Sequence, residues 1–86
     1  METRIALIGV IVSDISQGSK INALLSQYQE YILGRMGLPH QRYRDGEIAI
    51  ISVAIEAPAN VISALSGKLG MIRGISSKVI YHSAAD

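Results

Sequence analysis

The stretch Arg4-Ile5-Ala6-Leu7-Ile8-Gly9-Val10-Ile11-Val12-Ser13 decides the fold class of this chain. It is apolar at nearly every position, which is typical of a strand that is covered on both faces. Two further blocks, residues 47–56 and 75–81, are equally rich in the branched side chains that suit a pleated, buried surface. The sequence therefore predicts three strands around these blocks.

Two amphipathic helices are predicted between the strands. The first carries apolar side chains at intervals of three and four residues, namely Ile21, Leu24, Leu25, Tyr28, Tyr31 and Ile32. Asp14, Ser16 and Ser19 are candidate N-caps for it. The second starts near Pro58, repeats with Val61, Ile62, Leu65 and Leu69, and has Gly70 as a natural stop before Gly74 opens the last strand.

A weaker fourth strand is predicted over residues 33–37. We expect it to end before Pro39, because the residue before a proline favours extended geometry. Asp45-Gly46 is a turn signal directly before the next strand. The order βαββαβ predicts an α+β, ferredoxin-like sandwich: a four-stranded antiparallel sheet with two helices on one face. With 86 residues, the chain is expected to form a single domain over residues 1–86.

Both faces of the central strands are apolar. In the first strand Ile5, Leu7 and Ile11 point one way, whereas Ala6, Ile8, Val10 and Val12 point the other. If both helices cover one face, the second face exposes an apolar patch of about several hundred Å², which is more than a monomer usually tolerates. We expect a homodimer or homotetramer; the alternatives are a cover formed by the C-terminal tail or by another partner.

Composition narrows the range of partners and compartments. The net charge of +1 provides no field for strong nonspecific binding to nucleic acid or anionic lipid. The chain has no cysteine, which excludes disulfides and thiolate metal sites and fits a reducing compartment. No apolar run approaches the roughly 20 residues of a membrane span, so we expect a cytoplasmic protein without membrane attachment.

Motifs for catalysis and cofactor binding are missing from the sequence. The strand at 47–56 lacks the aromatic residues on which RNA bases would stack, and Gly67-Lys68 lacks the other residues of a phosphate-binding loop. His40 and Asp45 lie with Arg42 and Arg44 in a polar connection, but no nucleophile at a defined spacing accompanies them. We therefore predict no catalytic residue, no metal site and no cofactor.

The connection after the first strand is the candidate ligand site. Asp14, Ser16 and Gly18 lie where the free N–H groups of a helix N-terminus would suit a carboxylate or a phosphate. Helix capping alone explains the same residues.

The segments 32–39 and 64–70, with 72–79 following, resemble the family of regulators of the iron-only hydrogenase system. These segments read Ile-Leu-Gly-Arg-Met-Gly-Leu-Pro and Ala-Leu-Ser-Gly-Lys-Leu-Gly. That family is similar to ACT-like domains and to the C-terminal domain of the nickel-responsive repressor. The resemblance implies an ACT-like ferredoxin fold, oligomers, and a role in sensing a small ligand or in regulating transcription.

Two departures limit what the resemblance implies. The repressor's His-x-His pair and cysteine correspond to Met36-Gly37-Leu38 and Gly46-Glu47 here, so nickel sensing is not implied. The first strand begins near residue 3, which leaves no preceding DNA-binding segment in this sequence, so DNA binding is expected only through a partner protein. By analogy with ACT domains, which bind amino acids where such loops meet between subunits, Asp14, Ser16 and Gly18 are the predicted ligand-binding residues.

The leading hypothesis is a non-enzymatic, oligomeric, ACT-like regulatory module that binds a small effector. The alternative is a non-catalytic scaffold or interaction module that uses its apolar face for a partner. A third interpretation is a small dimeric enzyme, to which only His40, Tyr43, Tyr28 and Tyr31 would contribute.

Overall fold

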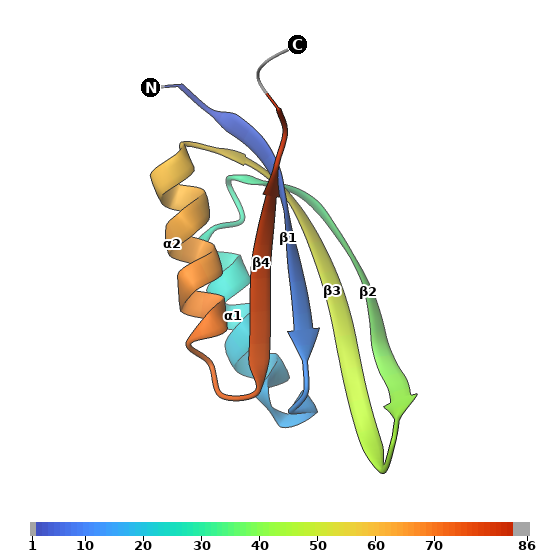
Figure 1. Cartoon of the computed structure of the whole chain (residues 1–86). Coiled ribbons are helices and arrows are strands. Elements are labelled where there is room, and N and C mark those ends of the chain that lie inside the picture. Colours follow the sequence, from blue (N-terminus) through green and yellow to red (C-terminus); the bar gives the residue numbers. More distant parts are fainter. Residues whose placement is uncertain (1, 84–86) are drawn as a thin grey trace.

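The computed structural model describes residues 2–83, which form one antiparallel sheet with two helices on one of its faces (Figure 1). The elements are β1 (Arg4–Val12), a 3-10 helix (Ile15–Gln17), α1 (Gly18–Gln27), β2 (Ile32–Tyr43), β3 (Gly46–Ala57), α2 (Ala59–Gly70) and β4 (Ile75–Tyr81). The strand order is β2-β3-β1-β4. The predicted βαββαβ ferredoxin-like sandwich is confirmed, with β1 and β3 in the centre.

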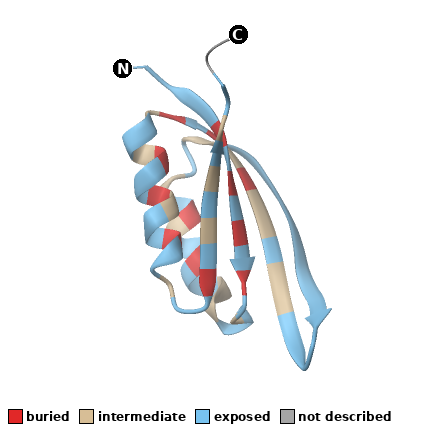
Figure 2. Cartoon of the chain, viewed as in Figure 1, coloured by how far each residue is buried: buried red, intermediate tan, exposed pale blue. Residues whose placement is uncertain are grey.

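The core lies between the sheet and the helices (Figure 2). β1 and β3 pair in antiparallel register, with Ile8 opposite Val53 and Ala6 opposite Ile55, and all four side chains are at most 2% exposed. The helices bury Ile21 and Leu25 from α1 and Ile62, Leu65 and Leu69 from α2. Among residues 2–83, no polar or charged side chain is buried, so the core is held together by apolar packing.

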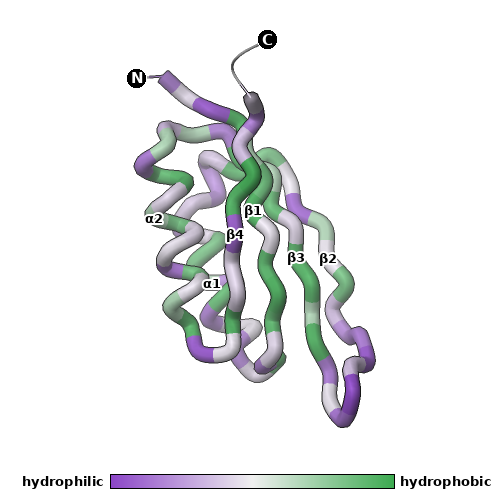
Figure 3. Tube along the Cα trace, viewed as in Figure 1, coloured by the Kyte–Doolittle hydropathy of each residue, from purple (hydrophilic) through white to green (hydrophobic). Residues whose placement is uncertain are grey.

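The other face of the sheet carries the remaining apolar side chains of the strands. Ile5, Leu7 and Ile11 alternate with the buried residues of β1 and are 45–49% exposed. Exposed apolar residues of the other strands join them, namely Leu33, Met36, Leu38, Ile50 and Ile80. Figure 3 shows the hydrophobic character of the central strands along their length. The predicted division of β1 into two apolar faces is confirmed.

The second strand is longer than its sequence predicts. β2 does not end before Pro39 but continues to Tyr43, and its pairing with β3 is irregular between Leu38 and Gln41. A proline is tolerated there because β2 is an edge strand and the irregularity spares a ladder hydrogen bond. β2 and β3 consequently form a hairpin that projects beyond the end of β1, whose last partner in β3 is Ala49 (Figure 1).

The helix ends differ in detail from the prediction. α1 ends at Gln27, and Tyr31 belongs to the following turn, where its N–H donates to the carbonyl of Tyr28 (2.9 Å). α2 ends at Gly70 as expected, but the left-handed glycine is Gly74, with φ of +79°. Within residues 2–83, no helix has the length and apolarity required to cross a membrane.

Truncation of a core side chain should destabilise the protein strongly. Ile8 is fully buried in the central strand, and removing a buried isoleucine side chain typically costs about 2–5 kcal/mol through lost burial and the remaining cavity. We expect this loss for Ile8→Ala in urea denaturation at fixed protein concentration. Met71→Ala is the control, because Met71 is 86% exposed and such surface changes usually stay within about 0.5 kcal/mol. Equal losses in the two variants would contradict the described core.

Candidate functional site

The connection between β1 and α1 is a capped turn. The carboxylate of Asp14 accepts hydrogen bonds from the backbone N–H of Ser16 (3.1 Å) and from the Ser16 hydroxyl (2.5 Å). Asp14 is thereby the N-cap of the 3-10 helix, whereas the N-cap of α1 is Gln17, whose side chain makes no capping bond. Two of the three predicted ligand residues, Asp14 and Ser16, are therefore joined by hydrogen bonds.

The same turn is braced by the connection between α2 and β4. The Ser13 N–H donates to the carbonyl of Gly74 (2.8 Å). Gly74 has a positive φ, and a Cβ atom built on it would lie 2.8 Å from the Cβ of Asp14. Only glycine fits this close approach, because other residues would be strained in φ and would collide with Asp14.

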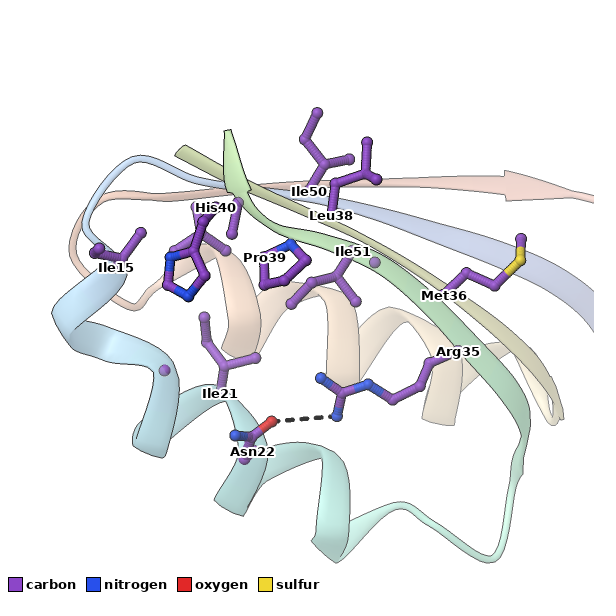
Figure 4. A pocket seen from close by; sticks show the side chains of 14 residues that line it. Ile15, Ile21, Asn22, Arg35, Met36, Leu38, Pro39, His40, Ile50 and Ile51 are labelled. Atoms are coloured by element: carbon purple, nitrogen blue, oxygen red, sulfur yellow. Dashed lines mark hydrogen bonds between the residues drawn. The ribbon is translucent and has the colours of Figure 1, made fainter. Parts of the chain in front are cut away.

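A cavity of about 450 Å³ lies between the start of α1 and the strands β2 and β3 (Figure 4). Apolar side chains line most of it, among them Ile15, Ile21, Pro39 and Ile51. Gly18 borders it at the start of α1. The segment 35–40 of β2 forms the wall of the cavity opposite α1.

Three polar side chains reach this cavity: Asn22 from α1, and Arg35 and His40 from β2. The Arg35 guanidinium donates to Oδ1 of Asn22 (3.2 Å), as the dashed line in Figure 4 marks. Nδ1 of His40 lies 3.8 Å from Oε2 of Glu47. Guanidinium, amide and imidazole groups beside apolar walls can bind an anionic group that is attached to an apolar body.

A second hollow of about 470 Å³ lies on the other side of the 3-10 helix. Its lining is mostly polar and consists of Ser13, Asp14, Ile15, Arg42, Asp45, Gly46 and Glu47. The three predicted ligand residues are thus not gathered in one pocket: Gly18 borders the cavity between α1 and β2, Asp14 borders this second hollow, and Ser16 lines neither.

No sequence motif marks Arg35 or Asn22 as a site residue. Asn22 is one of the polar residues between the apolar positions of the predicted helix, and Arg35 lies inside the predicted strand 33–37. The register with β3 places Arg35 on the same side of the sheet as Val53 in the core, and the local sequence does not specify this register. The acidic side chain next to His40 is Glu47 and not Asp45. In residues 2–83, no group of three or more His, Asp and Glu residues could hold a metal ion.

The sequence and the fold match a known protein family. The model of the TM1266-like family, described as "Iron-only hydrogenase system regulator, putative", matches residues 4–79. This chain belongs to that family. The structure of TM1266 from Thermotoga maritima is similar, with 31% sequence identity and a TM-score of 0.82 over 95% of this chain and 100% of that chain. The resemblance to the family of regulators of the iron-only hydrogenase system is confirmed.

More distant structures share the fold of this TM1266-like chain. CPII, a nitrogen regulatory PII-like protein from Thiomonas intermedia K12 bound to ADP, AMP and bicarbonate, has 13% identity and a TM-score of 0.57 over 95% of this chain and 94% of that chain. Its apo form has 11% identity and a TM-score of 0.56 over 94% and 92% of the two chains. No curated protein matches the sequence.

Replacement of Gly74 should destabilise the turn. We expect Gly74→Ala to lower the free energy of unfolding by about 1–3 kcal/mol, because alanine is strained at positive φ and would press on Asp14. Gly70→Ala is the matched control, since the nearest atom to its added Cβ is 3.9 Å away, and there the expected change is at most a gain of about 1 kcal/mol. Urea denaturation of both variants measures the difference, and equal stabilities would contradict the described contact.

Asp14 should titrate at a lower pH than an ordinary aspartate. The Ser16 hydroxyl, followed by the Ser16 N–H, holds the pKa of Asp14 below its ordinary value. A lowered folded-state pKa stabilises the fold at pH values above the unfolded-state pKa, and this contribution is lost as the pH falls through the folded-state pKa. In NMR titration of the carboxyl carbons, we expect Ser16→Ala to raise the pKa of Asp14 and Ser19→Ala to leave it unchanged. An unaltered pKa in Ser16→Ala would show that the hydroxyl bond does not form in solution.

Proposed function

We propose that this protein is a non-enzymatic regulatory module that binds a small anionic effector in the cavity between α1 and β2. The observation that carries the proposal is the pairing of apolar walls with Arg35, Asn22 and His40 in one cavity of about 450 Å³. Membership of a family described as a regulator of the iron-only hydrogenase system supports a regulatory role.

The chemistry of the cavity indicates the effector class. Arg35 offers a planar set of donors that matches a carboxylate or a phosphate, and Asn22 already orients this guanidinium from α1. Ile21 and Ile51 offer contacts to an apolar or planar body. Amino acids and nucleotides combine these two features. The CPII structure with ADP, AMP and bicarbonate supports this choice, because that protein has the same fold and was solved with anionic ligands.

The predicted ligand residues have two roles in this proposal. Gly18 borders the effector at the start of α1. Asp14 and Ser16 act indirectly, because their mutual hydrogen bonds hold the turn that sets the position of the 3-10 helix and Ile15. The module acts as a homodimer or homotetramer.

A role in transcription would operate through a partner protein. The net charge of the chain is +1, and the exposed hairpin combines Arg42 and Arg44 with Asp45 and Glu47. Such a mixed surface lacks the concentrated positive charge that drives binding to the DNA backbone. Effector binding in the module would therefore be transmitted by protein contact.

Loss of Arg35 should abolish effector binding. Titration calorimetry of the full chain with ADP, AMP and each of the amino acids should give saturable binding of at least one of these compounds. For the bound compound, we expect Arg35→Gln to weaken binding by about 10-fold or more, the effect of losing a charge-assisted hydrogen bond of roughly 1.5–3 kcal/mol.

Arg42→Gln is the matched control, because Arg42 lies on the same strand but borders the second hollow. Its affinity should equal that of the wild type. Equal affinities of wild type and Arg35→Gln would exclude the cavity between α1 and β2 as the effector site. A selective loss of affinity in Arg42→Gln would place the effector in the second hollow. If no compound of either class binds, the alternative function as a scaffold or interaction module takes precedence.

A further inference from the structure

The open face of the sheet, opposite the helices, carries exposed apolar side chains from all four strands. We define it by the exposed apolar side chains on this side, Ile5, Leu7, Ile11, Leu33, Met36, Leu38, Ile50 and Ile80, which are 38–75% exposed. The β1–β3 register pairs Ile11 with Ile50, and the β2–β3 register pairs Ile50 with Leu38, so these three side chains form one row across three strands. A second row joins Leu7 to its β4 neighbour Ile80.

The size of the open face suits a protein interface. Half-exposed side chains of this size each present on the order of 100 Å², so the eight together approach the roughly 800 Å² per partner of a standard interface. The largest apolar patch of a typical monomer is about 300–600 Å². A surface of this extent is costly in water and is stabilised when a partner covers it.

The charges on the open face favour a second copy over a charged partner. In the described part of the strands, the charged side chains on this side are Glu56 opposite Ile5 in β3 and Lys78 opposite Gly9 in β4. One anion and one cation cancel, so the face offers no net field that would select a basic or an acidic partner. Two copies would meet without net repulsion, and a closed, two-fold arrangement is the commonest form of such self-association.

Gly9 is an independent indication of a close neighbour at this face. It lies in the middle of β1, between the two apolar rows, with Ser52 as its partner in β3. A glycine inside a strand weakens the strand and often marks a place where another backbone approaches. Within residues 2–83 neither its conformation nor its space requires a glycine: its φ is not positive, and the nearest atom to an added Cβ is the Lys78 carbonyl oxygen at 3.9 Å.

We infer that a second copy of this chain packs its open face against the open face of the first, with closest approach along the row of Gly9 and Ser52. The rows of Leu7 and Ile11 on either side would then interdigitate with those of the partner, as in the core between two packed sheets. This inference is independent of the effector proposal, because it concerns the opposite side of the sheet and needs no ligand.

The test is the molar mass in solution. Light scattering coupled to size exclusion, at low micromolar concentration and without added ligand, should give at least twice the mass of one chain. Gly9→Leu should reduce this to the mass of one chain, because its side chain fills the space that the partner occupies while finding room within its own chain. Far-UV circular dichroism should show that the variant keeps its fold.

Gly67→Leu is the matched control. Gly67 lies on the exposed side of α2, on the helix layer, and also has room for a side chain. This variant should keep the mass of the wild type. If Gly9→Leu fails to fold, Ile11→Lys decides instead, because it places a charge in the centre of the face at a half-exposed position. The inference would be overturned if the wild type had the mass of one chain. It would also be overturned if folded Gly9→Leu and Ile11→Lys variants kept the wild-type mass, and this result would assign the association to the sheet edges.

Discussion

The antiparallel pairing of β1 with β3 is the constraint on which the rest of the structure depends. Side chains alternate between the faces of a strand, so this register fixes which residues face the helices and which do not. Ile8 and Val53 are directly opposite each other in the core, and three residues further along β1 Ile11 is opposite Ile50 on the open face. Because both sets are apolar, the sheet would gain from cover on both sides, whereas residues 2–83 provide helices for one side only. A shift of one residue along one strand would move its core residues to the open face.

β2 connects the two regions for which we propose a role. Its side that faces the helix layer carries Arg35 and Pro39 at the effector cavity, whereas Met36 and Leu38 point away from the helices (Figure 4). The strand is at the edge of the sheet and contains two irregularities in its pairing with β3, so it has fewer constraints than β1 or β3. A change in the position of β2 would therefore alter both the cavity and the open face. An effector that binds more tightly to one position of β2 would therefore also change the affinity between two copies, if their association depends on the same position of this strand.

The fold could be predicted from the sequence because the apolar pattern, the helix signals and the turn signals were consistent with one another. Branched apolar blocks, helical periodicity and the turn at Asp45-Gly46 all pointed to one order of elements, and that order is observed. The prediction is less accurate at β2, which continues past Pro39 along the sheet edge. The candidate site is missed for a different reason. Asp14 and Ser16 are local in sequence and could be recognised as a cap, whereas the cavity depends on bringing Asn22 and Arg35 together across a turn, which no local pattern encodes.

Three glycines differ in the structural reason for their presence. Gly74 is required by its positive φ and by its approach to Asp14. At Gly37 an added Cβ would make a tight contact of 3.1 Å with the Ile50 carbonyl oxygen. Both features lie inside the chain. Gly9 has neither reason, although it lies in the most buried strand pair of the sheet, where a larger side chain would improve strand formation. The second copy inferred at the open face would approach this position and would offset the stabilisation that Gly9 forgoes.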